Sequence, residues 1–179
     1  GSSAMVANTT GSQNVAVGFY ALDANTTAND NTAIGYQALT SNTTGASNVA
    51  VGNYALSANS TGGSNTAVGY QALLTNTTAD SNTAIGLDAM KLNTTGFECV
   101  AVGHEALQAN TTAAYGIAIG KSALKANTTG ASNIGIGYTA LTSNTTGTRN
   151  IAIGHNAYGG SDTENDNMAI GHTAMATNT

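Results

Sequence analysis

The chain has 179 residues, a net charge of −5 and only 7% charged residues, with 22 Gly, no Pro and no Trp. Its four Lys and Arg residues are too few to neutralise a phosphate backbone, which argues against nucleic-acid binding. No run approaches the roughly 18 apolar residues of a membrane span, so we expect no membrane insertion. Because Ala, Thr, Asn and Gly dominate and Leu is sparse, the composition predicts a thin, repetitive core and excludes a thick globular one.

A glycine follows a small residue and Val or Ile at a fixed spacing of 17 residues throughout the chain. A period without gaps predicts stacked coils, because a coil of changed length would lose register with its neighbours. We therefore expect an all-β parallel solenoid (β-roll), built as a single repeat array over residues 1–179 with about ten and a half repeats. Both ends fall inside a repeat, which suggests a fragment of a longer fibre. The repeated structural glycines are Gly18, Gly35, Gly52, Gly69, Gly86, Gly103, Gly120, Gly137, Gly154 and Gly171.

The residues before each glycine read as a short strand, first at residues 15–17 and then in every repeat. Alternation puts the first and third strand residues, mostly Val, Ile or Thr, on one side and Ala on the other. We expect the Val/Ile side to fill the interior of the coil. The Ala column then faces outward, where small residues let another backbone approach. This arrangement predicts self-association, with three parallel chains, intertwined or side by side, as a homotrimer.

Each glycine ends its strand at a turn that favours positive φ, which Gly adopts without steric cost. The following x-x-Ala-Leu segment fits either a second strand or a single helical turn. An extended repeat is roughly 56 Å long, which allows two strands of about five residues in each coil. With a rise of about 4.8 Å per coil, the stacked coils form a rod of roughly 50 Å. A polar Asn-Thr-Thr link completes most repeats. The two Asn columns are expected to form hydrogen-bonded ladders along the rod.

The position directly after the glycine is the most variable and the most aromatic one in the repeat. If exposed, its rings and polar groups form a row that contacts a glycan or a protein receptor. The alternative is that they pack on the next coil or on a neighbouring chain. His155 and His172 are one repeat apart, but no third type of metal ligand lies nearby. These two residues therefore give only weak support for a metal site. The candidate contact residues are Phe19, Tyr36, Tyr70, His104, Tyr138, His155 and His172.

The ninth repeat replaces Asn-Thr-Thr by an acidic segment with Asp162, Glu164 and Asp166 at alternating positions. Alternating oxygen ligands in a Gly-rich loop suggest calcium, although the match to a full calcium motif is poor and a solvated acidic loop is the alternative. We expect no cofactor. The single Cys99 replaces the usual Asn of its repeat and has no partner for an intrachain disulfide.

The phrases Asn-Thr-Ala-Ile-Gly-Tyr-Gln-Ala-Leu at 31–39 and Asn-Thr-Ala-Val-Gly-Tyr-Gln-Ala-Leu at 65–73 resemble two related groups. One is the head repeats of trimeric autotransporter adhesins, and the other is the repetitive shafts of phage tail-fibre proteins that carry endosialidase-type chaperones. The resemblance covers essentially the whole chain. It implies a homotrimeric, left-handed parallel β-roll outside the cell, on a bacterial surface or a virion, that works in host attachment. The adhesin heads have a shorter repeat, so the long polar link favours the fibre-shaft group.

These observations predict a structural or adhesive segment that spaces or presents a receptor-binding region. An ice-binding β-solenoid is the alternative, because Thr columns on a rod of low charge offer a regular surface. Adjacent Thr residues point to opposite faces of an extended chain, however, whereas a flat double row needs Thr-x-Thr. Catalytic Ser-His-Asp or Cys-His sets, phosphate loops and clusters of carboxylates or bases in adjacent coils are not recognisable, and we expect no enzyme activity.

Overall fold

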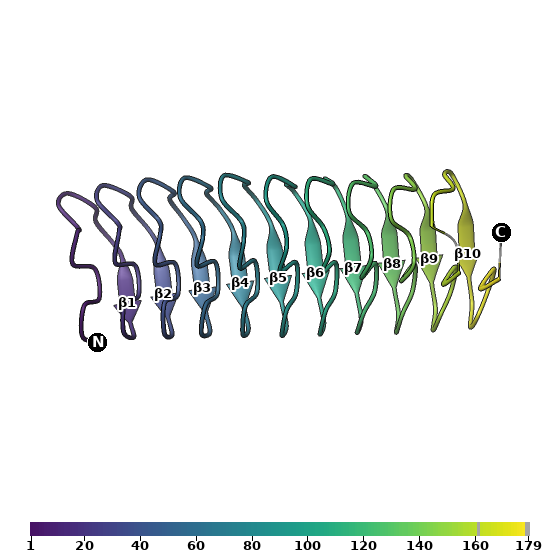
Figure 1. The fold of residues 1–179 in the computed structure, drawn as a ribbon, viewed down its shortest axis with the longest axis horizontal. Helices are drawn as coiled ribbons and strands as arrows, with labels where there is room; N and C mark the ends of the chain where they lie inside the picture. Colours follow the sequence, from purple (N-terminus) through teal and green to yellow (C-terminus); the bar gives the residue numbers. More distant parts are fainter. Residues whose placement is uncertain (161, 178–179) are drawn as a thin grey trace.

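The computed structural model describes residues 1–160 and 162–177, which form an all-β parallel solenoid of about nine turns, with coils of about 17 residues. Ten short strands lie side by side in chain order in a single parallel sheet along the rod, with the first and the last strand at opposite ends of it (Figure 1). The strands are β1 (Val15–Val17), β2 (Thr32–Ile34), β3 (Val49–Val51), β4 (Thr66–Val68), β5 (Thr83–Ile85), β6 (Val100–Val102), β7 (Ile117–Ile119), β8 (Ile134–Ile136), β9 (Ile151–Ile153) and β10 (Met168–Ile170).

Each strand pairs with the next at the same repeat position, for example Thr66 with Thr83 and Ala67 with Ala84. The fixed period therefore sets the register of the whole sheet. The predicted positive φ of the glycine after each strand is confirmed, with values from 126° to 140°. At Gly103 an added Cβ would lie 2.6 Å from the carbonyl oxygen of Gly120 in the next coil. Glycine is thus required both by its φ and by close contact between coils.

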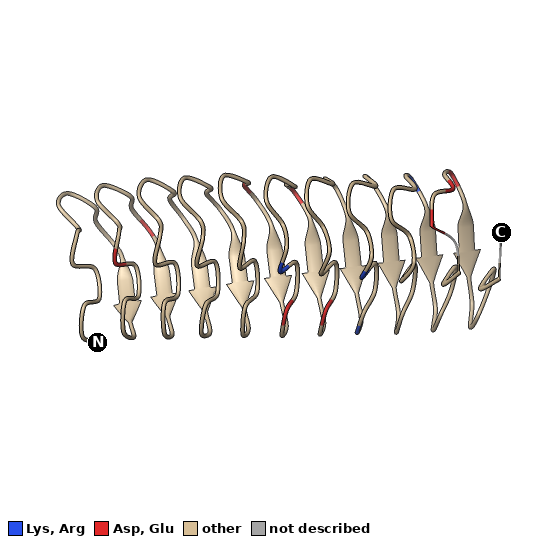
Figure 2. Ribbon diagram, in the orientation of Figure 1, with Lys and Arg blue, Asp and Glu red and all other residues tan. Residues whose placement is uncertain are grey.

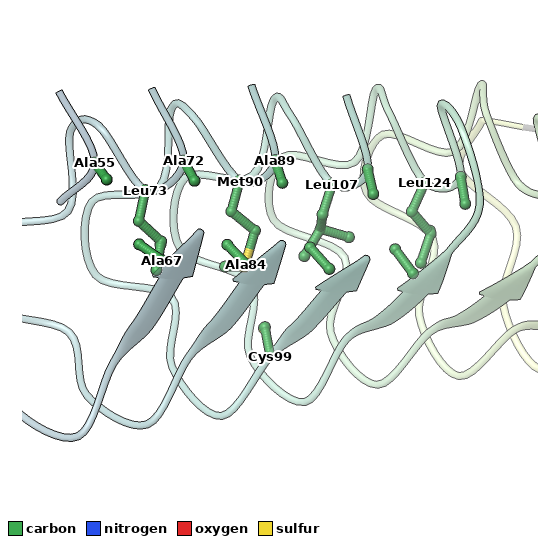
Figure 3. Packing of buried hydrophobic residues seen from close by; sticks show 14 of the residues in the cluster. Ala55, Ala67, Ala72, Leu73, Ala84, Ala89, Met90, Cys99, Leu107 and Leu124 are labelled. Atoms are coloured by element: carbon green, nitrogen blue, oxygen red, sulfur yellow. The ribbon is translucent and has the colours of Figure 1, made fainter. Parts of the chain in front are cut away.

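The predicted orientation of the strands is wrong, because Ala faces the interior and the Val/Ile side faces outward. Ala67 and Ala84 are fully buried, whereas Ile85 remains 40% exposed. Leu73 and Met90, from the segment after the glycine, point toward the strands, and Ala67 and Ala84 point back at them (Figure 3). One large side chain per coil fills this thin interior, which leaves room for only a methyl group from the strand.

The segment after the glycine forms neither the second strand nor the helical turn allowed by the sequence. In the second coil the N–H of Ala38 donates to the carbonyl of Gly35 at 3.4 Å, which closes a β-turn. Gln37 and Leu39 have φ of 52° and 53°, in the left-handed region. Backbone bonding between coils nevertheless continues, since the N–H of Leu39 donates to Ala55 at 3.0 Å. Each coil therefore has one strand of three residues where two of about five were expected.

A buried ladder of side-chain amides runs along the rod, as predicted for the Asn of the polar link. The Nδ2 of Asn76 donates to Oδ1 of Asn59 in the preceding coil at 2.9 Å and to the carbonyl of Ala79 at 3.0 Å. Each buried Nδ2 group is thus paired with the neighbouring amide and with backbone, which removes the penalty of burying it alone. The amide ladder comprises Asn8, Asn25, Asn42, Asn59, Asn76, Asn93, Asn110, Asn127 and Asn144.

The second Asn column, directly before the strands, connects coils in a different way. Asn65 accepts from the backbone N–H of Asn82 at 3.0 Å and donates to the carbonyl of Ala79 at 2.8 Å. Cys99 occupies this column in the sixth coil, where it is buried and accepts from the N–H of Gly116 through its sulfur at 3.4 Å. Burial raises the pKa of its thiol. Cys99 thus stands in for a structural Asn.

Candidate functional site

The outward side of the sheet, which we call the outer sheet face, extends along the rod from β1 to β10. It consists of the first and third side chains of β1–β10, of which three are Thr and all others are Val, Ile or Met. None is charged, and Figure 2 shows the charged residues scattered over the turns and links and absent from the strands. Val17 is 54% exposed and Ile119 is 39% exposed. A row of exposed and half-buried β-branched residues along a rod is typical of an interaction surface.

The residues directly after the strand glycines, called the ring column, line one edge of this face. The side chains of this column are exposed and also pack on the next coil. From the sequence, exposure and packing had been alternatives. Near the N-terminal end, Phe19 stacks on Tyr36 with centroids 5.9 Å apart and an angle of 8°. Tyr54 bridges Tyr36 and Tyr70 through edge contacts at 5.3 and 6.3 Å. Phe19, Tyr36 and Tyr70 remain between 39% and 47% exposed.

Two members of this aromatic cluster, Tyr20 and Tyr54, were not predicted from the sequence. Both lie one position further along the coil, where the residue adopts a left-handed φ. The ring of Tyr20 packs edge-on against Phe19 at 4.1 Å. Burial and the neighbouring Tyr36 and Tyr70 raise the pKa of Tyr54. The signal available in the sequence was the alternation of Tyr and Gln at this second position.

The C-terminal half of the ring column has a different chemistry. Tyr138 stacks on His155 with centroids 5.1 Å apart and 22° between planes, and His155 stacks on His172 at 4.9 Å and 19°. The ammonium of Lys121 lies 6.0 Å from the Tyr138 ring centroid, at the limit of a cation–π contact. All four side chains are exposed. The structure therefore aligns two of the predicted His candidates as parallel rings, which do not converge on one metal ion.

His104 begins this half of the ring column and lies beside an ion pair. Glu105 accepts from the ammonium of Lys125 at 2.8 Å and from the hydroxyl of Ser122 at 3.1 Å. These hydrogen bonds, that of Lys125 above all, hold the pKa of Glu105 below its usual value, and His104 adds to the effect. The carboxylate of Glu105 is thus already paired with a cation.

The acidic residues of the ninth repeat do not form a common site. Asp166 accepts from Arg149 through both oxygens, at 2.6 and 2.8 Å, and this hydrogen-bonded pair lowers the pKa of Asp166. The carboxylate of Glu164 accepts from the N–H of Thr163 at 3.2 Å, and the carbonyl of Asp162 accepts from Thr145. Within residues 1–160 and 162–177, no three His, Cys, Asp or Glu side chains are grouped to hold a metal ion.

The two threonines of the polar link differ in role. In most coils the hydroxyl of the first donates to the carbonyl of the next coil, as Thr94 does to Thr111 at 2.9 Å. The second is exposed in every coil and forms a single row on the link. This row consists of Thr10, Thr27, Thr44, Thr61, Thr78, Thr95, Thr112, Thr129, Thr146 and Thr163.

The described part of the chain has no pocket, and it contains no helix long and apolar enough to cross a bilayer. Its chemistry is thus presented on open, linear surfaces. Comparisons with protein-family models, with curated proteins and with solved structures gave no match. The described residues present three candidate surfaces: the outer sheet face, the ring column and the threonine row.

Proposed function

We propose that this chain is a structural and adhesive segment of an extracellular surface fibre or phage tail fibre, in which three copies associate through the outer sheet face. The rod spaces or presents a region that attaches to a cell. The observation that supports this most strongly is the uncharged row of exposed and half-buried, mostly Val and Ile, residues along β1–β10. Such a row stays in water only at a cost that burial against other copies removes.

The outer sheet face is narrow but regular along the whole rod. Nine steps of about 4.8 Å between strands and a width of roughly 10 Å for strands of three residues give a face of roughly 400 Å² per chain. Three chains that turn this face to a common axis bury roughly 1,200 Å² in total, or roughly 400 Å² for each pair of chains. This area is small for a single pairwise interface, so the association is expected to strengthen as the number of coils increases. Each copy presents the same residues at the same rise, so parallel copies match along the whole rod.

The proposed interface differs from the one that the sequence suggested. The Ala column was expected between chains, but Ala33, Ala50 and Ala67 are fully buried inside their own coil. Association through the opposite side of the strands keeps the prediction of a homotrimer and changes the residues that form it. The phrases around Tyr36 and Tyr70, which resemble adhesin heads and fibre shafts, support the fibre assignment.

The mass of the particle in solution tests this proposal. Native mass spectrometry, combined with light scattering at micromolar concentration, is expected to give the mass of three chains. A dimer would contradict the trimeric arrangement. A stable single chain, with the outer sheet face in water, would contradict the proposed fibre segment.

An ice-binding solenoid remains the second candidate, favoured by the exposed row of second threonines. The first threonines are committed to bonds between coils, as Thr94 is to Thr111, so they do not supply a second row. The residues two positions after the exposed Thr vary from Gly63 to Phe97, which breaks the flatness of the surface. Clear thermal hysteresis would favour this function over the fibre, and its absence is expected.

A further inference from the structure

We propose that Tyr36 and Tyr54 form an oxidative cross-linking site, at which a haem peroxidase with hydrogen peroxide joins the two phenol rings through a carbon–carbon bond. Tyr36 lies in the second coil, directly after Gly35, and Tyr54 lies in the third coil, two positions after Gly52. The bond would tie these coils together covalently. The chain has a single cysteine, Cys99, so an intrachain disulfide does not supply such a tie. This inference goes beyond the role of the chain as a fibre segment, because it assigns a modification to the segment itself.

Tyr54 has a phenol ring on each side of it along the rod. Its ring centroid lies 5.3 Å from that of Tyr36 and 6.3 Å from that of Tyr70. Oxidative coupling joins two phenols, so a tyrosine whose ring contacts another tyrosine is the one placed to react within its own chain. The Tyr36–Tyr54 pair has the shorter separation of the two.

The other tyrosines of the described residues lack a phenol as neighbour. Tyr158 is fully buried inside the ninth coil, out of reach of an oxidant. The remaining rings pack on side chains that are not phenols: Tyr20 on Phe19, Tyr115 on Phe97, and Tyr138 on His155. The geometry therefore concentrates coupling at one place in the chain.

The phenolic ends of the paired rings lie together, as well as the rings themselves. Burial raises the pKa of Tyr54, and the phenolic group of Tyr36 raises it further, ahead of that of Tyr70. Phenoxyl radicals couple at the ring carbons next to the carbon that bears the oxygen. Rings whose hydroxyl ends are neighbours thus bring the reacting carbons close, which favours Tyr36 over Tyr70 as the partner.

The pair is also accessible to an oxidant at the surface. Tyr36 is 39% exposed, and Tyr54 is half-buried beside it. The planes of the two rings differ by 76°, so one ring has to turn toward the other before the bond forms. The exposed ring of Tyr36 has room at the surface for this rotation.

The reaction balances with one molecule of hydrogen peroxide. The peroxidase removes one electron and the phenolic proton from each ring, which gives two phenoxyl radicals. These form a carbon–carbon bond between their ortho carbons, and the hydrogen on each of these carbons shifts to the oxygen of its own ring, which restores both phenols. Hydrogen peroxide takes up the two electrons and two protons and becomes two molecules of water. The chain loses two hydrogen atoms and no other atom.

Treatment of the intact chain with hydrogen peroxide and a haem peroxidase tests the proposal, with dityrosine followed by its fluorescence. Cleavage before Asp30 and Asp80 releases residues 30–79, which hold Tyr36, Tyr54 and Tyr70 and no other tyrosine. We expect this peptide to lose the mass of two hydrogen atoms. Because the rings are held in contact, coupling within one chain should exceed coupling between chains by about tenfold or more on a denaturing gel.

Conservative variants locate the bond. Tyr36→Phe keeps a ring but removes its phenol, so it should lower the dityrosine yield about tenfold, and Tyr54→Phe should do the same. Tyr70→Phe is expected to lower the yield only slightly. Tyr115→Phe is the matched control, because the ring of Tyr115 packs on Phe97 at 5.2 Å and its loss should leave the yield unchanged.

Four results would overturn the proposal: no dityrosine in residues 30–79, a yield that survives in Tyr36→Phe, an equal loss in Tyr115→Phe, or dityrosine found only between chains. The expected bond joins two coils of one chain. These results are therefore independent of the number of chains in the particle, and a single chain in solution would contradict the proposed fibre segment without affecting the cross-link.

Discussion

Replacing Ile119 by Lys is expected to convert the associated rods into single chains. Ile119 is the third residue of β7, near the middle of the outer sheet face, and is 39% exposed in the isolated chain. A lysine there keeps its charge in water in the single chain but would be buried among apolar side chains between copies, which is unfavourable by several kcal/mol. Light scattering should therefore report a threefold fall in mass, while circular dichroism shows an unchanged strand signal.

Thr112→Lys provides the control for this experiment. Thr112 is exposed on the polar link and lies outside the outer sheet face, so the same added charge should leave the mass unchanged. If the Ile119 variant kept the mass of the associated form, the face would not lie between copies. If both variants dissociated, the effect would come from net charge and not from the position of the lysine.

Replacing Gly103 by Ala is expected to destabilise the middle of the rod strongly. Gly103 has a φ of 135°, which an L residue rarely adopts, and the new Cβ would lie 2.6 Å from the carbonyl oxygen of Gly120. That oxygen belongs to the backbone of the next coil and cannot rotate away. Backbone strain and overpacking together suggest a loss of roughly 3–5 kcal/mol in the free energy of unfolding.

Gly116→Ala is the matched control, because Gly116 lies one coil away and lacks the positive φ. Its added Cβ would meet Leu107 at 3.5 Å and Cys99 at 3.7 Å, which are ordinary contacts. Thermal unfolding followed by circular dichroism, with hydrogen exchange to locate the loosened coils, compares the two variants. A long repeat array need not unfold in two states, so the hydrogen-exchange pattern decides. Equal stability of the two variants would show that the close contact between coils is not required.

The period of the sequence was sufficient to place every strand and the turn after it. Because each coil repeats at the same spacing, the residues before Gly69 and before Gly86 have to pair in register, and they do so at Thr66 and Thr83. The positive φ of these glycines and the amide ladder through Asn76 also follow from the repeat. These features depend on the φ that the recurring glycine favours and on the same residue recurring at the same position of the next coil. Both can be read from the repeat.

The direction in which the strand side chains point could not be obtained from the same pattern. Alternation separates Ala84 from Ile85 but does not say which of the two lies inside. That choice depends on the thickness of the coil, which is set by the left-handed turn around Leu73 and by its side chain filling the interior. Hydrophobicity alone favoured the larger Ile for the core, whereas the volume left by Leu73 and Met90 selects Ala.

The candidate site was predictable as a column but not as a set of contacts. The sequence marked Tyr138, His155 and His172 as related positions, and the structure stacks them as parallel rings. The sequence did not mark Tyr54, whose place in the N-terminal cluster depends on the left-handed turn that follows each strand. The alternating positions of Asp162, Glu164 and Asp166 suggested a shared calcium site. In the structure, however, the carboxylate of Asp166 pairs with Arg149 from the preceding coil.

Thiol protection at the outer sheet face tests most directly that this face, and not the Ala column, joins the copies. In a Cys99→Ser background, a single cysteine is placed either at Ile119 or at the exposed Thr112, and the rate of its reaction with a maleimide is measured on the associated particle. The proposed interface predicts slow reaction at position 119 and fast reaction at position 112. Equally fast reaction at both positions would contradict it, because the outer sheet face would then lie open to solvent.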